Sequence, residues 1–317
     1  MNGNDRAGGA RARLLDRGPV VVLALFSVVA VAGYAVFGRD PSRVVGLSEG
    51  AMRFYAVSFG FFAQVQVVLA GLVLAVWLYR RAGLRWLPAF AVVYALSLGS
   101  ELMGTAWGVP FGPYSYTDLL GAKWLGLVPV LIPLSWFFMA VPAYGLAARA
   151  LRGGSSPALG RAAVEATGHG GAAGRIVLGS LLLLAWDLTL DPAMSEVTRY
   201  WVWGEPGPYY GMPLMNLFGW YVTGVVLMAV LEWLGARSWL SGGSTGWLAA
   251  FYGANLILPL GMTLAAGMWG AAVATAMVLG GVVVWASLRS RPRSGTRSVD
   301  PEPGLAGGAT PGAEVAR

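Results

Sequence analysis

The sequence predicts an all-α membrane protein, a polytopic helix bundle with about eight (seven to eight) transmembrane helices. Of its 317 residues, 56% are hydrophobic and only 12% are charged, and the mean hydropathy is +0.62. Soluble domains carry about 25% charged residues, so an ordinary soluble fold is excluded. The apolar residues also fall in runs close to the roughly 20 residues that a helix needs to cross a bilayer.

These apolar runs give the predicted spans in chain order. The last two are separated by so short a Gly-rich turn that a count of seven stays open. Polar segments with few apolar side chains lie at 1–17 and 289–317, and we expect them to be disordered cytoplasmic tails around an integral membrane domain at 18–288. The runs cover residues 19–37, 54–79, 86–106, 124–148, 175–191, 213–234, 245–264 and 267–288.

The positive charges predict the orientation of the chain. Of the 22 Lys and Arg residues, 17 fall in the tails and loops on one side of the spans, and only Arg39, Arg43, Arg53, Lys123 and Arg199 fall on the other. By the positive-inside rule both termini are cytoplasmic, and we expect the protein in a bacterial cytoplasmic (inner) membrane. The charges are spread over loops rather than gathered on one surface, so we expect membrane lipids and no nucleic acid as partners.

The near absence of metal-ligating side chains narrows the chemistry. The chain has no cysteine and a single histidine, His169, in a Gly-rich stretch. Disulfides, iron–sulfur clusters and thiolate nucleophiles are therefore excluded, and a membrane di-iron site would need several histidine ligands. We expect neither a metal site nor a cofactor.

Three carboxylates lie inside apolar runs and are the most informative residues of the chain. Glu101, Asp187 and Asp191 each sit where an acidic side chain costs roughly 2.5 to 3.5 kcal/mol at the centre of a spanning helix. Asp187 and Asp191 are four residues apart and share one helix face. With Asn216 they fall in the same leaflet. One such acid often only accepts hydrogen bonds from a neighbouring helix, but three with an amide in one layer predict a catalytic site.

Two loops on the side away from the positive charges are rich in Trp, Tyr, Gly and Pro. They cover residues 107–124 and 199–216. Gly and Pro fix turns, while Trp and Tyr favour the membrane–water boundary, so we expect ordered loops that cap the acidic layer. The rings that we expect to contact a substrate there are Tyr114, Tyr116, Trp203, Tyr209, Tyr210 and Trp220.

Three sequence blocks together resemble the carotenoid biosynthesis membrane proteins, a family that includes CruF-type carotenoid 1,2-hydratases and a hydratase of C50 carotenoids. The resemblance covers roughly residues 50–260. It implies addition of water to the terminal C1–C2 double bond of an acyclic carotenoid, with a ψ end like that of lycopene or γ-carotene, to give a tertiary alcohol. The matching residues are Glu101, Gly108, Pro110, Phe111, Gly112, Tyr114 and Tyr116; Trp186, Asp187, Asp191, Pro192 and Met194; and Trp201, Trp203, Gly207, Tyr209, Tyr210, Gly211, Pro213, Asn216, Gly219 and Trp220.

The residue inventory fits this chemistry. Hydration of such an alkene needs a proton donor in a dry pocket, a base for the water and a means of stabilising a tertiary carbocation. Apolar surroundings keep one carboxylic acid protonated while a second acts as base, and aromatic faces stabilise a cation. We expect Asp187 to be the general acid, Glu101 or Asp191 the base, and Asn216 the group that orients the water. The implied partner is a lipid-soluble C40 or C50 carotenoid, and association with other enzymes of the carotenoid pathway stays open.

Two other functions remain alternatives at this point. The D-L-T-L-D segment at 187–191 is reminiscent of intramembrane prenyltransferases acting on isoprenoids, which also need a second Asp-rich motif and basic residues beside a diphosphate. A membrane transporter or assembly protein could use the acids to carry protons and the Pro-rich segment at 129–142 to flex.

Overall fold

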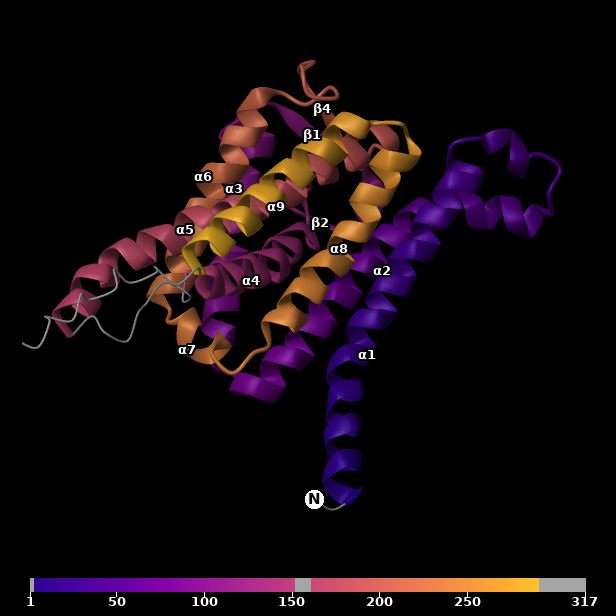
Figure 1. Cartoon of the computed structure of the whole chain (residues 1–317). Coiled ribbons are helices and arrows are strands. Elements are labelled where there is room, and N and C mark those ends of the chain that lie inside the picture. The colour runs from indigo at the N-terminus through magenta and orange to yellow at the C-terminus, as the bar shows by residue number, and fades with distance from the viewer. Residues whose placement is uncertain (1–2, 152–160, 291–317) are drawn as a thin grey trace, which may run out of the picture.

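The computed structural model describes residues 3–151 and 161–290, and within them the protein is a bundle of nine helices (Figure 1). Seven helical stretches there are long and apolar enough to cross a membrane, which confirms the predicted all-α integral membrane bundle. The helices are α1 (Gly3–Gly33), α2 (Glu49–Ala82), α3 (Leu87–Trp107), α4 (Ile132–Ala150), α5 (Arg161–Asp191), α6 (Leu214–Trp233), α7 (Ala236–Leu240), α8 (Thr245–Ala265) and α9 (Trp269–Ser290).

The helix α4 differs most from its predicted span. The run at 124–148 was expected to be one membrane helix, but its first part forms a short hairpin of β2 (Lys123–Trp124) and β3 (Val128–Pro129), and the helix begins only at Ile132. Most of α4 is buried, and it packs against α2, α3, α5, α6 and α8. A helix that is apolar on all sides is suited to such a central position.

Two predicted boundaries differ from the helix bounds in the structure. The first helix begins at Gly3, ahead of the predicted boundary at residue 18, and α5 begins at Arg161 rather than at 175. Residues 1–2 and 291–317 lie outside the described residues, so the predicted tails and the domain limits stay predictions.

The two aromatic loops pair with each other through a two-stranded ribbon. Strand β1 (Tyr114–Tyr116) is antiparallel to β4 (Trp201–Trp203), with Tyr114 opposite Trp203 and Tyr116 opposite Trp201. Side chains alternate between the faces of a strand, so these four rings share one face, and Ser115 and Val202 point the other way, into the surroundings. The inward face of the ribbon is therefore entirely aromatic.

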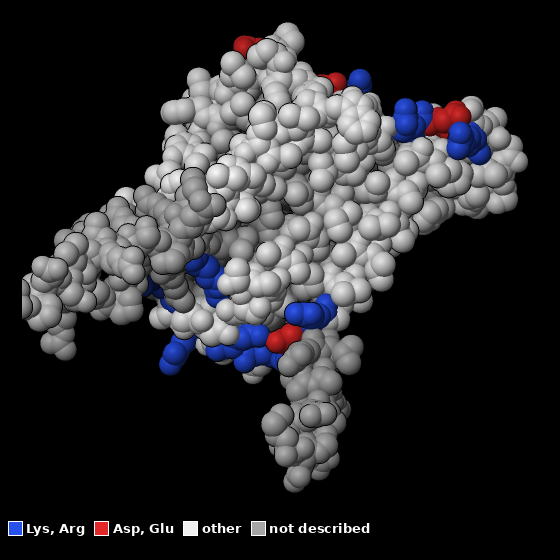
Figure 2. Space-filling model, in the orientation of Figure 1, with Lys and Arg blue, Asp and Glu red and all other residues white. Residues whose placement is uncertain are grey.

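The two ends of the bundle differ in charge. In Figure 2 many Lys and Arg side chains gather at the end where Figure 1 places α7, while fewer lie at the opposite end and on the arm that projects from it. At the α7 end Arg80 and Arg81 pair with Asp16, at 3.2 and 2.8 Å, and Arg149 donates to the carbonyl oxygens of Leu240 and Gly243. The aromatic ribbon thus closes the end of the bundle that is poor in positive charge.

Candidate active site

The acidic residues of the candidate site lie on α3 and at the end of α5, beneath the β1–β4 ribbon. All are buried, with exposed fractions of 4% for Glu101, 0% for Asp187 and 2% each for Asp191 and Asn216. The helix α5 ends at Asp191, and a π-helical turn at Pro192–Val197 leads on toward β4. Asn216 lies in the first turn of α6. Three separate helices therefore deliver polar groups to one end of the bundle.

Glu101 is held by three neutral donors. The hydroxyl groups of Tyr114 and Tyr116 both donate to its Oε2, the second at 2.7 Å, and Trp136 Nε1 donates to Oε1 at 2.9 Å. Burial, together with the neighbouring Glu101 charge, raises the pKa of both phenols well above the usual range, so they remain protonated donors. This arrangement solvates a carboxylate without any cation.

The close approach of Tyr114 depends on a glycine one turn after Glu101. A Cβ added at Gly104 would lie 2.8 Å from Phe111 Cδ2 and 2.9 Å from the Tyr114 hydroxyl, closer than real Cβ contacts come. Gly219 on α6 plays the same part on the other side, because a Cβ there would lie 2.6 Å from Phe111 Cδ1. The two glycines let the loop enter between α3 and α6 and bring Tyr114 to the acid.

Asp187 and Asp191 form a second acidic group on α5. Their four-residue spacing places both side chains on one face of the helix. Asn216 Nδ2 donates to Asp191 Oδ2, and the Trp201 side chain also contacts this carboxyl. Both oxygens of Asp187 are buried and accept no hydrogen bond from any described residue.

A cavity of about 30 Å³ lies between these acidic groups, enough for one or two water-sized groups. Both Glu101 and Asp191 line it, together with Asn216 and with Tyr114, Tyr116, Trp203 and Trp220 from the predicted set. No Lys or Arg among the described residues lines it. The aromatic walls are continuous, since Trp136 stacks on Trp220 with ring centroids 4.0 Å apart and Tyr116 packs edge-on against Trp201.

Three predicted residues lie outside this cavity. Asp187 does not line it, whereas Asp191, one turn later on α5, does. Tyr209 donates its hydroxyl to the Leu188 carbonyl at 2.8 Å, and Tyr210 packs against Tyr209 and lies beside Gly270 of α9. The roles predicted for all three stay predictions, but Tyr209 and Tyr210 occupy a place other than the one expected for substrate contacts.

One central residue was missed from the sequence. Trp136 of α4 both donates to Glu101 and forms a wall of the cavity. Its position in the middle of an apolar run was the available signal, because tryptophans that only anchor a helix lie near the membrane boundary.

Comparisons with known proteins place this geometry in context. A model of the family described as carotenoid biosynthesis protein matches residues 62–282, most of the chain. A bisanhydrobacterioruberin hydratase of Haloarcula japonica is 30% identical over 178 residues, which make up 56% of this chain and 53% of that protein. The match thus spans about half the length of this curated relative. No solved structure is significantly similar.

Proposed function

Because the chain belongs to the carotenoid biosynthesis protein family, we propose that it is a carotenoid hydratase that adds water to the terminal C1–C2 double bond of an acyclic carotenoid. The observation that carries the proposal is the cavity that Asp191 and Glu101 both line, so that carboxyl groups from two helices meet one space with aromatic walls. The hydratase among its relatives supports this class of reaction. Lycopene, with its unmodified ψ ends, is the proposed test substrate.

The reaction begins with a proton donor. The carboxyl of Asp191 faces the cavity and protonates C2 of the alkene, which leaves a tertiary carbocation at C1. The sequence predicts Asp187 as the general acid. Because Asp191 lines the cavity and Asp187 does not, we assign the proton transfer to Asp191 and give Asp187 the role of a neighbouring carboxyl that shares the proton of Asp191. Asn216 holds the Asp191 carboxyl in position through its amide.

The carbocation is then stabilised and captured. Trp136 and Trp220 present stacked ring faces at the cavity, and an aromatic face contributes about 2 kcal/mol or more to a desolvated cation. Glu101, as a carboxylate held by three donors, adds its negative charge and accepts a proton from the water whose oxygen bonds to C1. The proton balance closes when Glu101 returns this proton to Asp191 before the next turnover.

The location of the site suits the substrate. The cavity lies beneath the loop ribbon at the end of the bundle poor in positive charge, where a lipid-dissolved chain and interfacial water can meet. If the positive-inside rule holds for this chain, both termini are cytoplasmic and this end faces the opposite side.

The direct test is turnover by the purified protein. Protein in lipid vesicles that contain lycopene should yield a product heavier by one water per modified end, and in isotopically labelled water the new hydroxyl should carry the label. A product whose oxygen comes from dissolved dioxygen, or a reaction that consumes an isoprenyl diphosphate instead, would contradict the proposal.

A further inference from the structure

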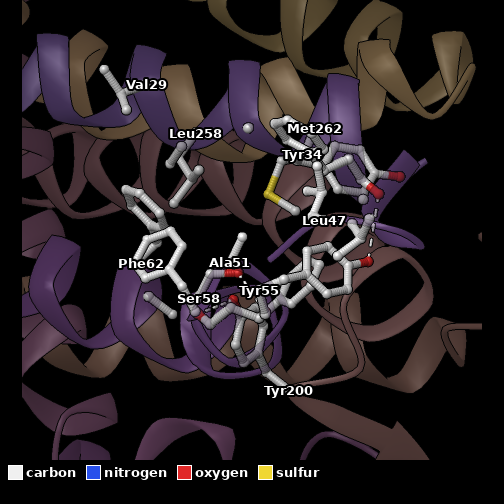
Figure 3. Close-up of a pocket in the computed structure, with 18 residues that line it drawn as sticks. Val29, Tyr34, Leu47, Ala51, Tyr55, Ser58, Phe62, Tyr200, Leu258 and Met262 are labelled. Atoms are coloured by element: carbon white, nitrogen blue, oxygen red, sulfur yellow. Dashed lines mark hydrogen bonds between the residues drawn. The ribbon is translucent and has the colours of Figure 1, made fainter. Parts of the chain in front are cut away.

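A second and larger cavity lies beneath the arm that α1 and α2 form where they meet. Its volume is about 330 Å³, and its walls come from the end of α1, the first half of α2, α8 and Tyr200. Figure 3 shows Tyr34, Phe62, Leu258 and Met262 gathered around it. None of its 18 lining residues carries a formal charge. The cavity is thus suited to an uncharged, apolar ligand.

This cavity opens toward the lipid. Several of its walls are large apolar side chains that remain exposed, with exposed fractions of 40% for Phe37, 43% for Leu47 and 56% for Phe54. Four charged residues of the arm form short-range ion pairs, Arg43 with Asp40 and Arg53 with Glu49, and charged side chains lie toward the upper edge of the arm in Figure 2. The charged edge fits the headgroup layer and the apolar opening fits the acyl chains below it.

A third cavity lies between this outer cavity and the site. It has a volume of about 70 Å³. It shares Ala63, Tyr200 and Leu258 with the outer cavity. On its other side it shares Ile132, Ser135, Leu190 and Trp201 with the site cavity. The three cavities therefore adjoin in a row from the lipid to the acids.

The polar side chains along this row are mostly engaged with the backbone. Ser135 donates to the Ile132 carbonyl at 2.7 Å, Asn255 to the Phe251 carbonyl at 2.9 Å, and Tyr200 to the Phe59 carbonyl at 2.8 Å. In the middle cavity Gln66 accepts from Ser27, and its Nε2 has no partner among the described residues. A hydrocarbon chain in this row would displace few hydrogen bonds.

We propose that the three cavities form one channel that binds the polyene chain of the substrate, with the reacting end group at Asp191 and the rest of the chain leaving past Ala63 into the lipid. The identity of this ligand rests on the proposed function. The site cavity of about 30 Å³ is far too small for a whole carotenoid, so the chain must lie elsewhere. The outer and middle cavities offer an adjoining, uncharged path that ends at the acids.

The test is to block the channel at a wall that the outer and middle cavities share. Ala63→Phe, at the junction of the outer and middle cavities, should reduce lycopene bound per mole of purified protein at least tenfold, measured by visible absorbance after removal of free pigment. Ala56→Phe is the matched control, because Ala56 is on the same helix but exposed and lines none of these cavities. It should bind lycopene as the native protein does.

A second blocking variant keeps the test valid when Ala63→Phe fails to fold. If Ala63→Phe does not fold by circular dichroism, Ala51→Phe at the half-exposed mouth of the outer cavity should still fold and lower lycopene binding several-fold. Native binding in a folded blocking variant would overturn the channel. Equal loss in Ala56→Phe would also overturn it, because the effect would then be unrelated to the cavity.

Binding and turnover separate the two proposals. Suppose that the native protein binds lycopene without hydrating it, and that Ala63→Phe loses this binding. The channel would then be supported and the proposed function would be wrong. Normal hydration by folded Ala63→Phe would end the channel and leave the function standing.

Discussion

Two places in this bundle hold carboxyl groups away from full solvent exposure, partly buried in one and fully buried in the other, and they stabilise them in opposite ways. Near the α7 end, Glu232 of α6 is paired with Arg175 of α5, with Nη2 to Oε1 at 2.6 Å and Nε to Oε2 at 2.8 Å, and Tyr144 adds a hydrogen bond. Beneath the ribbon, the side chains that donate hydrogen bonds to Glu101 and Asp191 within the described part of the chain are neutral Tyr, Trp and Asn.

The difference distinguishes an acid that stabilises the fold from acids that can take part in a reaction. An acid with its own guanidinium partner has its charge neutralised and its lone pairs occupied, so removing it mainly leaves the partner charge unpaired. Acids that accept hydrogen bonds from neutral groups remain able to donate a proton or to stabilise a positive charge. Burying such acids lowers the stability of the fold, but it serves a reaction. Substitutions at both places test this contrast, and their expected effects on turnover run from about 1000-fold at Asp191 to none at Glu232.

The largest effect is expected at Asp191. Asp191→Asn retains the size of the side chain and its contact with Asn216 but removes the exchangeable acid, so hydration of lycopene should fall about 1000-fold. Product is measured by mass spectrometry at equal amounts of folded protein. The control is Asp118→Asn, which should keep native activity because Asp118 is an exposed acid whose partner is Lys123. Native activity in Asp191→Asn would show that the acids beneath the ribbon are not needed for the reaction.

Replacing Glu101 should come next. Glu101→Gln preserves a hydrogen-bonding side chain but removes the negative charge, and turnover should fall about 100-fold because both the base and the charge opposite the carbocation are lost. Binding of lycopene by absorbance should be unchanged. A loss of binding instead of turnover would mean that Glu101 only shapes the cavity.

Removing one donor to Glu101 should cost less. Tyr116→Phe deletes the hydrogen bond at 2.7 Å, and turnover should fall about tenfold, which corresponds to about 1.4 kcal/mol. Ser115→Ala is the neighbouring control, since Ser115 points away from the cavity on the same strand. Equal losses in the two variants would indicate a general effect on the loop.

The smallest effect on turnover is expected at Glu232. Glu232→Gln should leave hydration per folded protein unchanged but lower the free energy of unfolding by about 2 kcal/mol, because Arg175 then lacks its carboxylate. Thermal unfolding in detergent measures this, and the double variant with Arg175→Gln should recover part of the loss. A Glu232→Gln protein that is stable but inactive would show that the contrast is wrong.

The sequence was sufficient for the fold class and for the layer in which the acids lie. Apolar runs and the cost of intramembrane acids depend on local composition, so the membrane helix bundle, predicted with seven to eight spans, and the residues Glu101, Asp187 and Asp191 could be found without coordinates. The central place of α4 could not, because a helix buried in protein and a helix in lipid have similar composition.

The finer arrangement of the site depends on long-range contacts. Nothing local indicates that β1 pairs with β4, since the two strands are far apart in the chain, or that Asp191 rather than Asp187 faces the cavity. Tyr209 and Tyr210 were grouped with the other rings by composition alone, yet they contact α5 and α9. Tertiary packing, rather than residue type, decides which of these side chains reach the cavity.

The antiparallel register of the ribbon has a consequence for how such proteins can diverge. Because side chains alternate, inserting a single residue within either three-residue strand would rotate the following ring to the outside and put a small or aliphatic neighbour in its place. Length changes should therefore be tolerated in the turns at either end, and almost never between Tyr114 and Tyr116 or between Trp201 and Trp203.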